Sequence, residues 1–431
     1  MKERKVLLDV LGNQTRRVVL EDGVPVEFAV ETHGHVRLTG NVYLGRVANL
    51  LRGMQAAFVD IGLEKNAFLS LDDLPPIAAD AAEVRVDFHA KPLRSGQEII
   101  VQVVKEPGGD KGPRITMNPT FPGKYLVLLP TLEAVGVSRH IQTEGRREAL
   151  YNLAQSICPP GMGLIIRTAA EDAPEEAIAA EAETLCGAWL ALAEDARTRK
   201  APSLLYDDGS LLSRARRDLN AEITLAPFDE AIEAKLEKAL ARKVWLPSGA
   251  YLVMDHTEAM TVIDVNSGKF TGKRSLGDTL LRLNIEAAKE IARLLRLRDV
   301  GGIVVIDFVD METDEDRQAV LEALHEALSQ DRAKHHVHGF TGAGLLEMTR
   351  RPVYQPVSEA LLAPCPRCHG EGAVPSVDAR ANALQREIRR RRAAGDESQM
   401  TITAPGDVIA ALERAGNLPE RIAFQPEGDT L

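Results

Sequence analysis

Short apolar runs alternate with polar residues through roughly the first quarter of the chain. Three such runs fill residues 4–32, and about five more fill residues 35–118, where residues 75–92 interrupt them like an inserted loop. Apolar residues at every second position are typical of half-buried strands. About five short strands joined by turns predict a small closed barrel of the OB type in the second block.

The apolar spacing then changes to the period of a helix. Two strand-like runs, at 125–129 and 163–168, are followed by helix-start signals at 172–175, which include a candidate Asx cap and a proline. Apolar residues next recur every three to four positions: Ile178, Ala182, Leu185, Trp189, Leu192 and Ala196. This spacing predicts one long amphipathic helix. Further helices are expected at 228–243 and 314–332.

Two apolar strands that each carry an aspartate form the centre of the prediction. Residues 261–268 contain Asp264, and residues 302–311 contain Asp307. Residues 278–298 between them have the spacing of a helix with one buried face. Strand, helix and strand make a βαβ unit with two parallel strands, and ligands collect at the carboxyl ends of such strands. We therefore expect Asp264 and Asp307 to lie together at a binding site.

The side chains at this expected site suit a hard cation. Asn266 adds an amide oxygen to the carboxylates of Asp264 and Asp307. Magnesium takes oxygen ligands and commonly binds through one or two carboxylates while keeping several waters. Spacing alone leaves an alternative, in which the aspartates cap strand ends or neighbouring helices.

Size and composition restrict the class of protein. With 431 residues the chain is expected to form two to four domains, and 45% hydrophobic with 27% charged residues is a globular composition. No segment has the run of about 20 apolar residues that a transmembrane helix needs. We expect a soluble cytoplasmic protein without a signal peptide. The formal charge of −11 argues weakly against a nucleic-acid partner, but basic residues can gather in one groove of an acidic protein.

Two places offer residues for binding nucleic acid. On the expected barrel, Phe58 and Phe68 would stack on bases, although both also suit a barrel core, and Lys105 and Lys111 would meet phosphates or base edges. The pair Arg167–Thr168 follows a strand and could hold a phosphate through a guanidinium and a hydroxyl, which is a weak signal by itself.

Cys365 and Cys368 form a Cys-x-x-Cys pair surrounded by Gly and Pro, as in a zinc knuckle. Structural zinc takes four ligands, and this pair supplies two. The other two could come from His369, from the histidines at 335, 336 and 338, from Cys158 and Cys186, or from the same knuckle of a second copy. A redox pair is less favoured, because its first cysteine would begin a helix. Cys158 and Cys186 also suit buried apolar positions.

Taken in order, eight segments of the chain resemble the bacterial ribonuclease E/G family of endoribonucleases. These segments are 58–60, 163–168, 261–268, 284–288, 295–299, 306–311, 344–349 and 365–368. The resemblance covers about residues 1–372, and its specificity lies in the ordered set rather than in one motif.

The resemblance implies a multidomain α+β fold. Its parts would be a reduced RNase H-like subdomain (1–34 and 203–239), an S1 domain with an OB fold (35–118), a 5′-sensor region (119–202), a DNase I-like catalytic domain (240–361), a zinc-link knuckle (362–372) and a small C-terminal domain (373–431).

The resemblance also implies an activity. The family cleaves single-stranded, A/U-rich RNA by hydrolysis to 5′-phosphate and 3′-hydroxyl ends, in ribosomal RNA processing or messenger decay. By position, Asp264 and Asp307 match its Mg²⁺ carboxylates, with Asn266 supporting them. Phe68 and Lys111 match the residues that hold a base beside the cleaved bond, with Phe58 and Lys105 nearby.

Two further sites follow from the same resemblance. Arg167, Thr168 and the backbone near Val127 match the pocket that senses a 5′-monophosphate. Cys365 and Cys368 match a knuckle that shares one Zn²⁺ with its twin in a second subunit, which implies a homodimer or a higher homo-oligomer.

The chain also departs from the family pattern. Several dozen residues are missing between Asn220 and Phe228, and the region after 373 is short. The competing hypothesis is therefore an S1-domain RNA-binding protein whose catalytic half has decayed. A related phosphodiesterase acting on DNA is a weaker third possibility.

Overall fold

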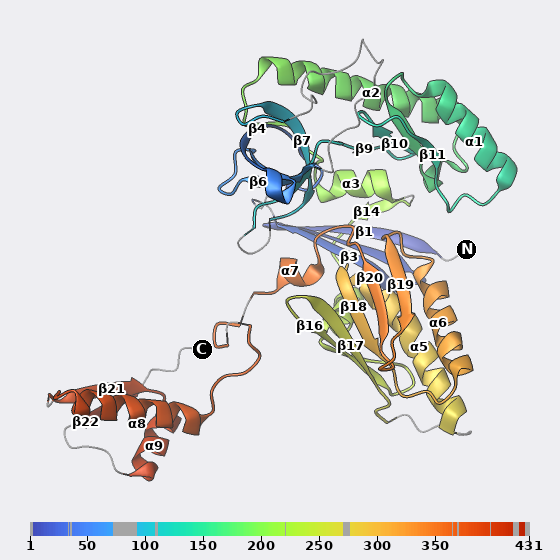
Figure 1. Cartoon of the computed structure of the whole chain (residues 1–431). Helices are drawn as coiled ribbons and strands as arrows, with labels where there is room; N and C mark the ends of the chain where they lie inside the picture. The colour runs from blue at the N-terminus through green and yellow to red at the C-terminus, as the bar shows by residue number, and fades with distance from the viewer. Residues whose placement is uncertain are drawn as a thin grey trace. The chain divides into compact units, whose positions relative to one another are not determined.

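The computed structural model describes residues 3–32, 34, 37–71, 93–107, 111–219, 221–269, 276–363, 365–368, 370–396, 398–416 and 422–426. The loop expected at 75–92 lies outside these residues, as does His369. The chain divides into two compact units, Met1–Leu361 and Leu362–Leu431. Together they form a multidomain α/β protein (Figure 1).

The first three predicted strands are confirmed and form an antiparallel sheet that β14 extends. The elements are β1 (Arg4–Leu11), β2 (Gln14–Glu21), β3 (Val24–Thr32), α3 (Leu211–Asp218) and β14 (Ile223–Leu225). The strand order is β14-β1-β2-β3, with β14 parallel to β1. Val6 and Leu8 of β1 pack with Ala215 and Leu219 in a small core. Val18 and Phe28 instead join the large core of the last sheet, so this subdomain is packed on two sides.

The predicted barrel is also confirmed. Its strands are β4 (Val42–Leu51), β5 (Ala56–Asp60), β6 (Ala67–Ser70), β7 (Glu98–Lys105) and β8 (Arg114–Thr116), and a 3-10 turn, η1, covers Arg52–Met54. The order β4-β5-β6-β8-β7 closes through pairing of β7 with β4, which gives a five-stranded barrel consistent with an OB fold. Its interior is apolar and includes Val59, Leu69 and Ile115. A sixth strand, β13 (Ser203–Tyr206), pairs antiparallel with the first residues of β4 (42–44).

A second small sheet and two helices follow the barrel. They are β9 (Phe121–Pro122), β10 (Leu126–Leu129), β11 (Val135–Val137), α1 (Glu144–Ile157), β12 (Gly163–Ile166), η4 (Thr168–Ala170) and α2 (Glu175–Thr198). The long amphipathic helix is confirmed as α2, which buries Trp189. Its N-cap is Pro174 without a side-chain cap, so the expected cap at Asp172 is wrong.

The largest sheet contains both aspartate strands. Its strands are β15 (Lys243–Trp245), β16 (Tyr251–His256), β17 (Met260–Asn266), β18 (Gly302–Asp307), β19 (His335–Phe340) and β20 (Leu346–Arg350), in the order β15-β16-β17-β18-β20-β19. As predicted, β17 and β18 run parallel. The associated helices are α4 (Glu230–Leu240), α5 (Leu276–Leu297), α6 (Asp314–Leu328) and α7 (Val357–Leu361).

The two faces of this sheet differ. Figure 1 shows α5 and α6 on one face, where Ile263 of β17 and Ile306 of β18 are fully buried in the large core. Successive side chains of a strand point to opposite faces. The neighbours of these isoleucines, Asp264 and Asp307, are therefore on the opposite face, which we call the open face, and both are exposed.

The second unit contains α8 (Val377–Ala393), β21 (Met400–Ala404), α9 (Gly406–Ala415) and β22 (Ile422–Pro426). The two strands pair in parallel and are joined in sequence through α9. Val408 and Leu412 of α9 fill its small core with Ala381 of α8. Among the described residues of the whole chain, no helix is long and apolar enough to span a membrane.

Candidate active site

Asp264 and Asp307 are direct neighbours in the parallel pair β17–β18. Their Cα atoms are register partners, and each residue lies at or near the carboxyl end of its strand. Adjacent strands lie about 4.8 Å apart, so both exposed carboxylates project from one place on the open face. The βαβ pattern predicted this pairing from sequence alone.

Asn266 is joined to Asp264 by a hydrogen bond. Its Nδ2 atom donates to Oδ2 of Asp264 at 2.7 Å. This contact holds the carboxylate in one orientation and leaves the amide oxygen of Asn266 as a further ligand atom. The capping alternative fails for Asp307 at the next helix, because α6 begins with Thr313 as its N-cap.

A buried asparagine supports the loop that follows Asp307. Asn284 lies on α5 with no solvent exposure. Its Nδ2 donates to the Val309 carbonyl at 2.7 Å, and its Oδ1 accepts from the Val309 N–H at 3.1 Å. This double contact ties the chain just beyond Asp307 to the helix beneath the sheet. From sequence, Asn284 was expected only as part of the 284–288 segment, and this positioning role was not predicted.

The donor set at the site consists of oxygen atoms, which fits magnesium better than zinc. Among the described residues, no group of three or more His, Cys, Asp and Glu side chains gathers in a metal-binding arrangement. A pair of carboxylates with one amide oxygen is a smaller set, compatible with an ion that keeps several of its waters.

The four predicted barrel residues are only partly brought together. Phe58 and Phe68 are register partners on β5 and β6, with ring centroids 6.2 Å apart at an interplanar angle of 73°. Both are half-buried, so they are neither fully core nor fully exposed. Arg114 is the register partner of Phe68 on one side and of Lys105 on the other. The row Phe58, Phe68, Arg114 and Lys105 thus crosses four strands, and the sequence analysis missed Arg114.

Lys111 lies at the entry to β8 and is exposed. The next residue must be glycine, because a Cβ on Gly112 would lie 2.1 Å from the carbonyl oxygen of Asn66. The Phe68 N–H donates to the Pro113 carbonyl at 2.8 Å. These backbone contacts hold the Lys111 segment against the strand that carries Phe68.

The predicted phosphate sensor contains contacts that sequence did not predict. The Arg167 N–H donates to the Tyr125 carbonyl at 2.7 Å, and its guanidinium donates to the Gly123 carbonyl. The same guanidinium pairs with Asp218 of α3 at 3.0 Å. The exposed hydroxyl of Thr168 lies 2.9 Å from that of Ser138.

Val127 is placed differently from this pair. On β10 it is the register partner of Ile165, two residues before Arg167, and it is half-buried. It belongs to the small sheet whose strand β12 ends one residue before Arg167.

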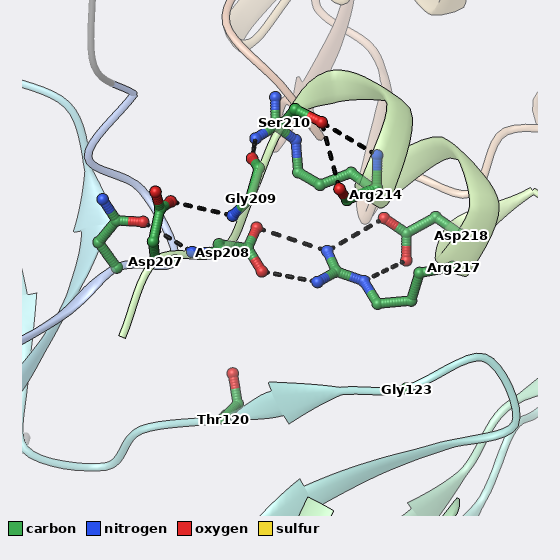
Figure 2. A network of polar contacts seen from close by, with 12 residues as sticks. Thr120, Gly123, Asp207, Asp208, Gly209, Ser210, Arg214, Arg217 and Asp218 are labelled. Atoms are coloured by element: carbon green, nitrogen blue, oxygen red, sulfur yellow. Dashed lines mark hydrogen bonds and ion pairs between the residues drawn. The ribbon is translucent and has the colours of Figure 1, made fainter. Parts of the chain in front are cut away.

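Arg217 fixes the carboxylate that holds Arg167. Figure 2 shows its guanidinium between Asp208 and Asp218, with Nη1 at 2.6 Å from Asp208 Oδ1 and Nε at 3.3 Å from Asp218 Oδ1. Burial alone would raise the pKa of Asp218, but the charges of Arg217 and Arg167 lower it below its ordinary value. Asp218 is therefore held ionised beside Arg167.

The four cysteines fall into two kinds. Cys158 and Cys186 pack against the apolar core around α2 but are only partly buried, so they are less buried than expected. Cys365 is exposed, and hydrogen bonds from the Cys368 and Arg367 backbone lower the pKa of its thiol. A lowered thiol pKa favours the thiolate that binds metal.

The chain is similar to known proteins over most of its length. The sequence model of the "Ribonuclease E/G family" matches residues 120–229 and 227–353. The chain is 38% identical to Ribonuclease G of Escherichia coli (strain K12) over 95% of this chain and 92% of that protein. It is 37% identical to Ribonuclease G of Haemophilus influenzae over 96% of this chain and 94% of that protein. It is 39% identical to Ribonuclease E of a Nostoc species over 84% of this chain and 57% of that protein. The chain therefore belongs to the ribonuclease E/G family.

The comparisons agree with a shortened chain. The alignment to the Escherichia coli protein has 450 positions. It includes 95% of the 431 residues of this chain, or about 409, so this chain has no residue at about 41 of those positions. The family match also divides into two segments at residues 227–229. That division lies beside the stretch between Asn220 and Phe228, where missing residues were expected.

Proposed function

We propose that this protein is an endoribonuclease that hydrolyses single-stranded, A/U-rich RNA with Mg²⁺ and leaves 5′-phosphate and 3′-hydroxyl ends. One observation carries the proposal, beyond membership of the family. Asp264 and Asp307 are exposed register partners on adjacent parallel strands, and Asn266 donates a hydrogen bond to Asp264. The pathway we propose is ribosomal RNA processing or messenger decay.

Each group has a separate task in this mechanism. Asp264 and Asp307 would hold the metal, and Asn266 keeps the Asp264 carboxylate in a fixed orientation. The ion supplies positive charge that stabilises the phosphate undergoing attack and promotes ionisation of the attacking water. The barrel row of Phe58, Phe68, Arg114 and Lys105 would bind single-stranded RNA. The aromatic rings would stack on bases, and the positive charges would meet phosphates.

The sensor accounts for a preference among RNA ends. Arg167 and Thr168, with the backbone near Val127, would bind a 5′-monophosphate, which carries more negative charge than an internal phosphodiester. The guanidinium uses Nη1 for the Gly123 carbonyl and for Asp218. Its other N–H groups remain for a phosphate, because a guanidinium has five donors.

The remaining assignments concern architecture and assembly. We assign residues 1–34 and 203–239 to a reduced RNase H-like subdomain, 35–118 to an S1 domain and 240–361 to a DNase I-like domain. Cys365 and Cys368 would share one Zn²⁺ with a second subunit, because each chain supplies two of the four ligands that a structural zinc takes.

A cleavage assay tests the proposal. Purified protein is incubated with Mg²⁺ and a 5′-monophosphorylated, A/U-rich RNA, and products are compared with those of the Asp264→Asn/Asp307→Asn double variant. We expect cleavage by the wild type and a loss of at least about a thousandfold in the variant, since metal chemistry is worth several kcal/mol. Asp314→Asn is the matched control, because this exposed aspartate pairs with Arg317 of its own helix, α6.

The same assay decides between the enzyme and the binding protein. A decayed binding module would bind RNA in EDTA but give no more product in Mg²⁺ than the double variant. Replacing the RNA by single-stranded DNA of the same sequence tests the third possibility, and cleavage of DNA at an equal rate would contradict the RNA assignment.

A further inference from the structure

Three side chains form a compact group on the open face of the sheet that carries Asp264 and Asp307. Trp245 of β15 and Tyr251 of β16 have ring centroids 5.1 Å apart. The Nζ atom of Lys243 lies 4.4 Å from the centroid of the indole and 3.5 Å from that of the phenol. We call these three residues the aromatic platform. None of them was a candidate in the sequence analysis.

Register places the platform beside the proposed active site. Trp245 is opposite Tyr251, and Tyr251 is opposite Asn266, so the three residues cross three neighbouring strands in one row. Lys243 is opposite Val253, which is opposite Asp264, in the next row on the same face. Because strands lie about 4.8 Å apart, Tyr251 is one strand from Asn266 and Trp245 is two strands away.

The backbone holds the tyrosine ring in place. Gly268 has a φ of +56°, and a Cβ there would lie 2.6 Å from the Gly249 carbonyl oxygen and 3.1 Å from Cδ1 of Tyr251. The chain leaving β17 therefore passes directly against the Tyr251 ring, which only glycine permits. The Lys269 N–H also donates to the Gly249 carbonyl at 3.2 Å. A ring restrained in this way loses little conformational entropy when it binds a ligand.

Within the platform, Trp245 exposes a large apolar surface while Tyr251 is half-buried. Trp245 is 55% exposed, whereas Trp189, the other tryptophan of the chain, is 2% exposed in a core. Exposed apolar surface of this kind indicates a binding site.

The surroundings favour a nucleic-acid base over a protein as the occupant. A protein seated on Tyr251 would extend over Asn266 and Asp264, which lie one strand away and must admit substrate. A single base covers only the rings, and every base offers a π-face for stacking. Lys243 adds the positive charge that a neighbouring phosphate requires.

We propose that Lys243, Trp245 and Tyr251 bind one base of single-stranded RNA by stacking, next to the phosphodiester bond that is cleaved. This inference rests on the proposed function and deepens it, because it places a base-binding position on the catalytic sheet itself, distinct from the barrel.

Tryptophan fluorescence tests the platform directly, because Trp189 is buried and Trp245 is exposed. The full chain is titrated with a nuclease-resistant 2′-O-methyl, A/U-rich oligonucleotide in EDTA, where no cleavage occurs. We expect saturable quenching that persists in Trp189→Phe, in which Trp245 is the remaining tryptophan. Binding without quenching in Trp189→Phe would overturn the proposal.

Variants separate stacking from other roles. Trp245→Leu and Tyr251→Leu should each weaken binding of a labelled oligonucleotide by about tenfold and raise KM more than they lower kcat, while Trp245→Phe keeps most of the affinity. Tyr151→Leu is the matched control, since Tyr151 is an exposed aromatic residue of α1. Equal affinity and KM for Trp245→Leu and the wild type would exclude stacking.

Two outcomes keep the inference separate from the proposed function. If the wild type cleaves RNA and both leucine variants cleave it with unchanged KM, the platform is wrong and the function stands. If the oligonucleotide quenches the tryptophan fluorescence of the wild type but the wild type does not cleave RNA, the proposed function is wrong and the proposal of a base-binding platform stands. Emission that changes with protein concentration in the absence of RNA, together with dissociation of an oligomer by Trp245→Leu in sedimentation, would show an interface between copies and overturn the proposal.

Discussion

Arg167 and Asp218 form an ion pair across 51 residues of sequence, with Nη1 3.0 Å from Oδ1. The pair links the loop after β12 to α3. Arg217 also contacts Asp218, as Figure 2 shows. A phosphate bound at Arg167 would share that guanidinium with Asp218. The sensor proposed here therefore comprises an acidic and a basic side chain rather than a free arginine.

Replacing Arg167 should reduce the preference for 5′-monophosphorylated RNA. In Arg167→Ala the charge that attracts the terminal phosphate is lost, so the ratio of cleavage rates on 5′-monophosphate and 5′-hydroxyl RNA should fall toward one. Arg197→Ala is the control, because Arg197 is exposed on α2 and pairs only locally with Glu194. A ratio that stays at the wild-type value in Arg167→Ala would remove the sensor assignment, and a thermal melt checks that the variant is folded.

Two variants of the barrel row should distinguish the contribution of charge to RNA binding from that of stacking. Arg114→Gln should weaken binding of single-stranded RNA and reduce the slope of log K against log salt by about 0.7, the value for one lost phosphate contact to a single strand. Phe68→Leu should weaken binding by about tenfold through lost stacking and leave the salt slope unchanged. Both are measured by titration with labelled RNA at several salt concentrations. Equal salt slopes for Arg114→Gln and the wild type would place Arg114 outside the RNA path.

Sequence predicted most where the determinants are local. Asp264 and Asp307 lie at or near the ends of the two strands of one βαβ unit, so the handedness and direction of that unit brought them together. Arg114 was missed because its place beside Phe68 depends on the parallel pairing of β6 with β8, which forms only when the barrel closes. The Arg167–Asp218 pair joins distant segments, and no periodicity encodes it.

The knuckle should bind about half a zinc ion per chain. Each chain supplies Cys365 and Cys368, and two chains complete the four ligands of a structural site. Metal analysis and sedimentation should show this ratio in an oligomer, and Cys365→Ser should lose both the zinc and part of the assembly. Cys158→Ser is the control, since Cys158 packs against a core. One zinc per chain in a monomer would rule out the shared site.

Arg350 should be among the costliest residues to remove from the catalytic sheet. It is buried at the end of β20, where Nε lies 2.7 Å from Asp331 and Nη1 lies 2.8 Å from Asp299. Arg350→Met leaves two buried carboxylates unpaired, and breaking a buried pair costs about 3–5 kcal/mol of unfolding free energy. Denaturant unfolding measures this loss. Arg242→Met is the control, because its pair with Asp255 is solvent-exposed and should change stability little.

Glu27 should give stability a defined dependence on pH. It is buried on β3, within 3.0 Å of Arg296 and of Arg332 and 3.4 Å from Arg17. Burial alone would raise its pKa, but the charges of Arg332, Arg17 and Arg296 lower the pKa from the ordinary 4.5 to about 2. Because the folded pKa is depressed, the contribution of Glu27 is fully present above pH 4.5 and is lost as the pH falls toward 2.

The test compares the wild type with Glu27→Gln by urea unfolding from pH 7 to pH 3. The difference in unfolding free energy should be constant down to about pH 5 and should narrow below pH 4.5, as the unfolded-state carboxyl takes up its proton. Glu194→Gln, at an exposed position of α2, should show no such change. A difference between the wild type and Glu27→Gln that stayed constant to pH 3 would show that the arginine cluster does not hold Glu27 ionised.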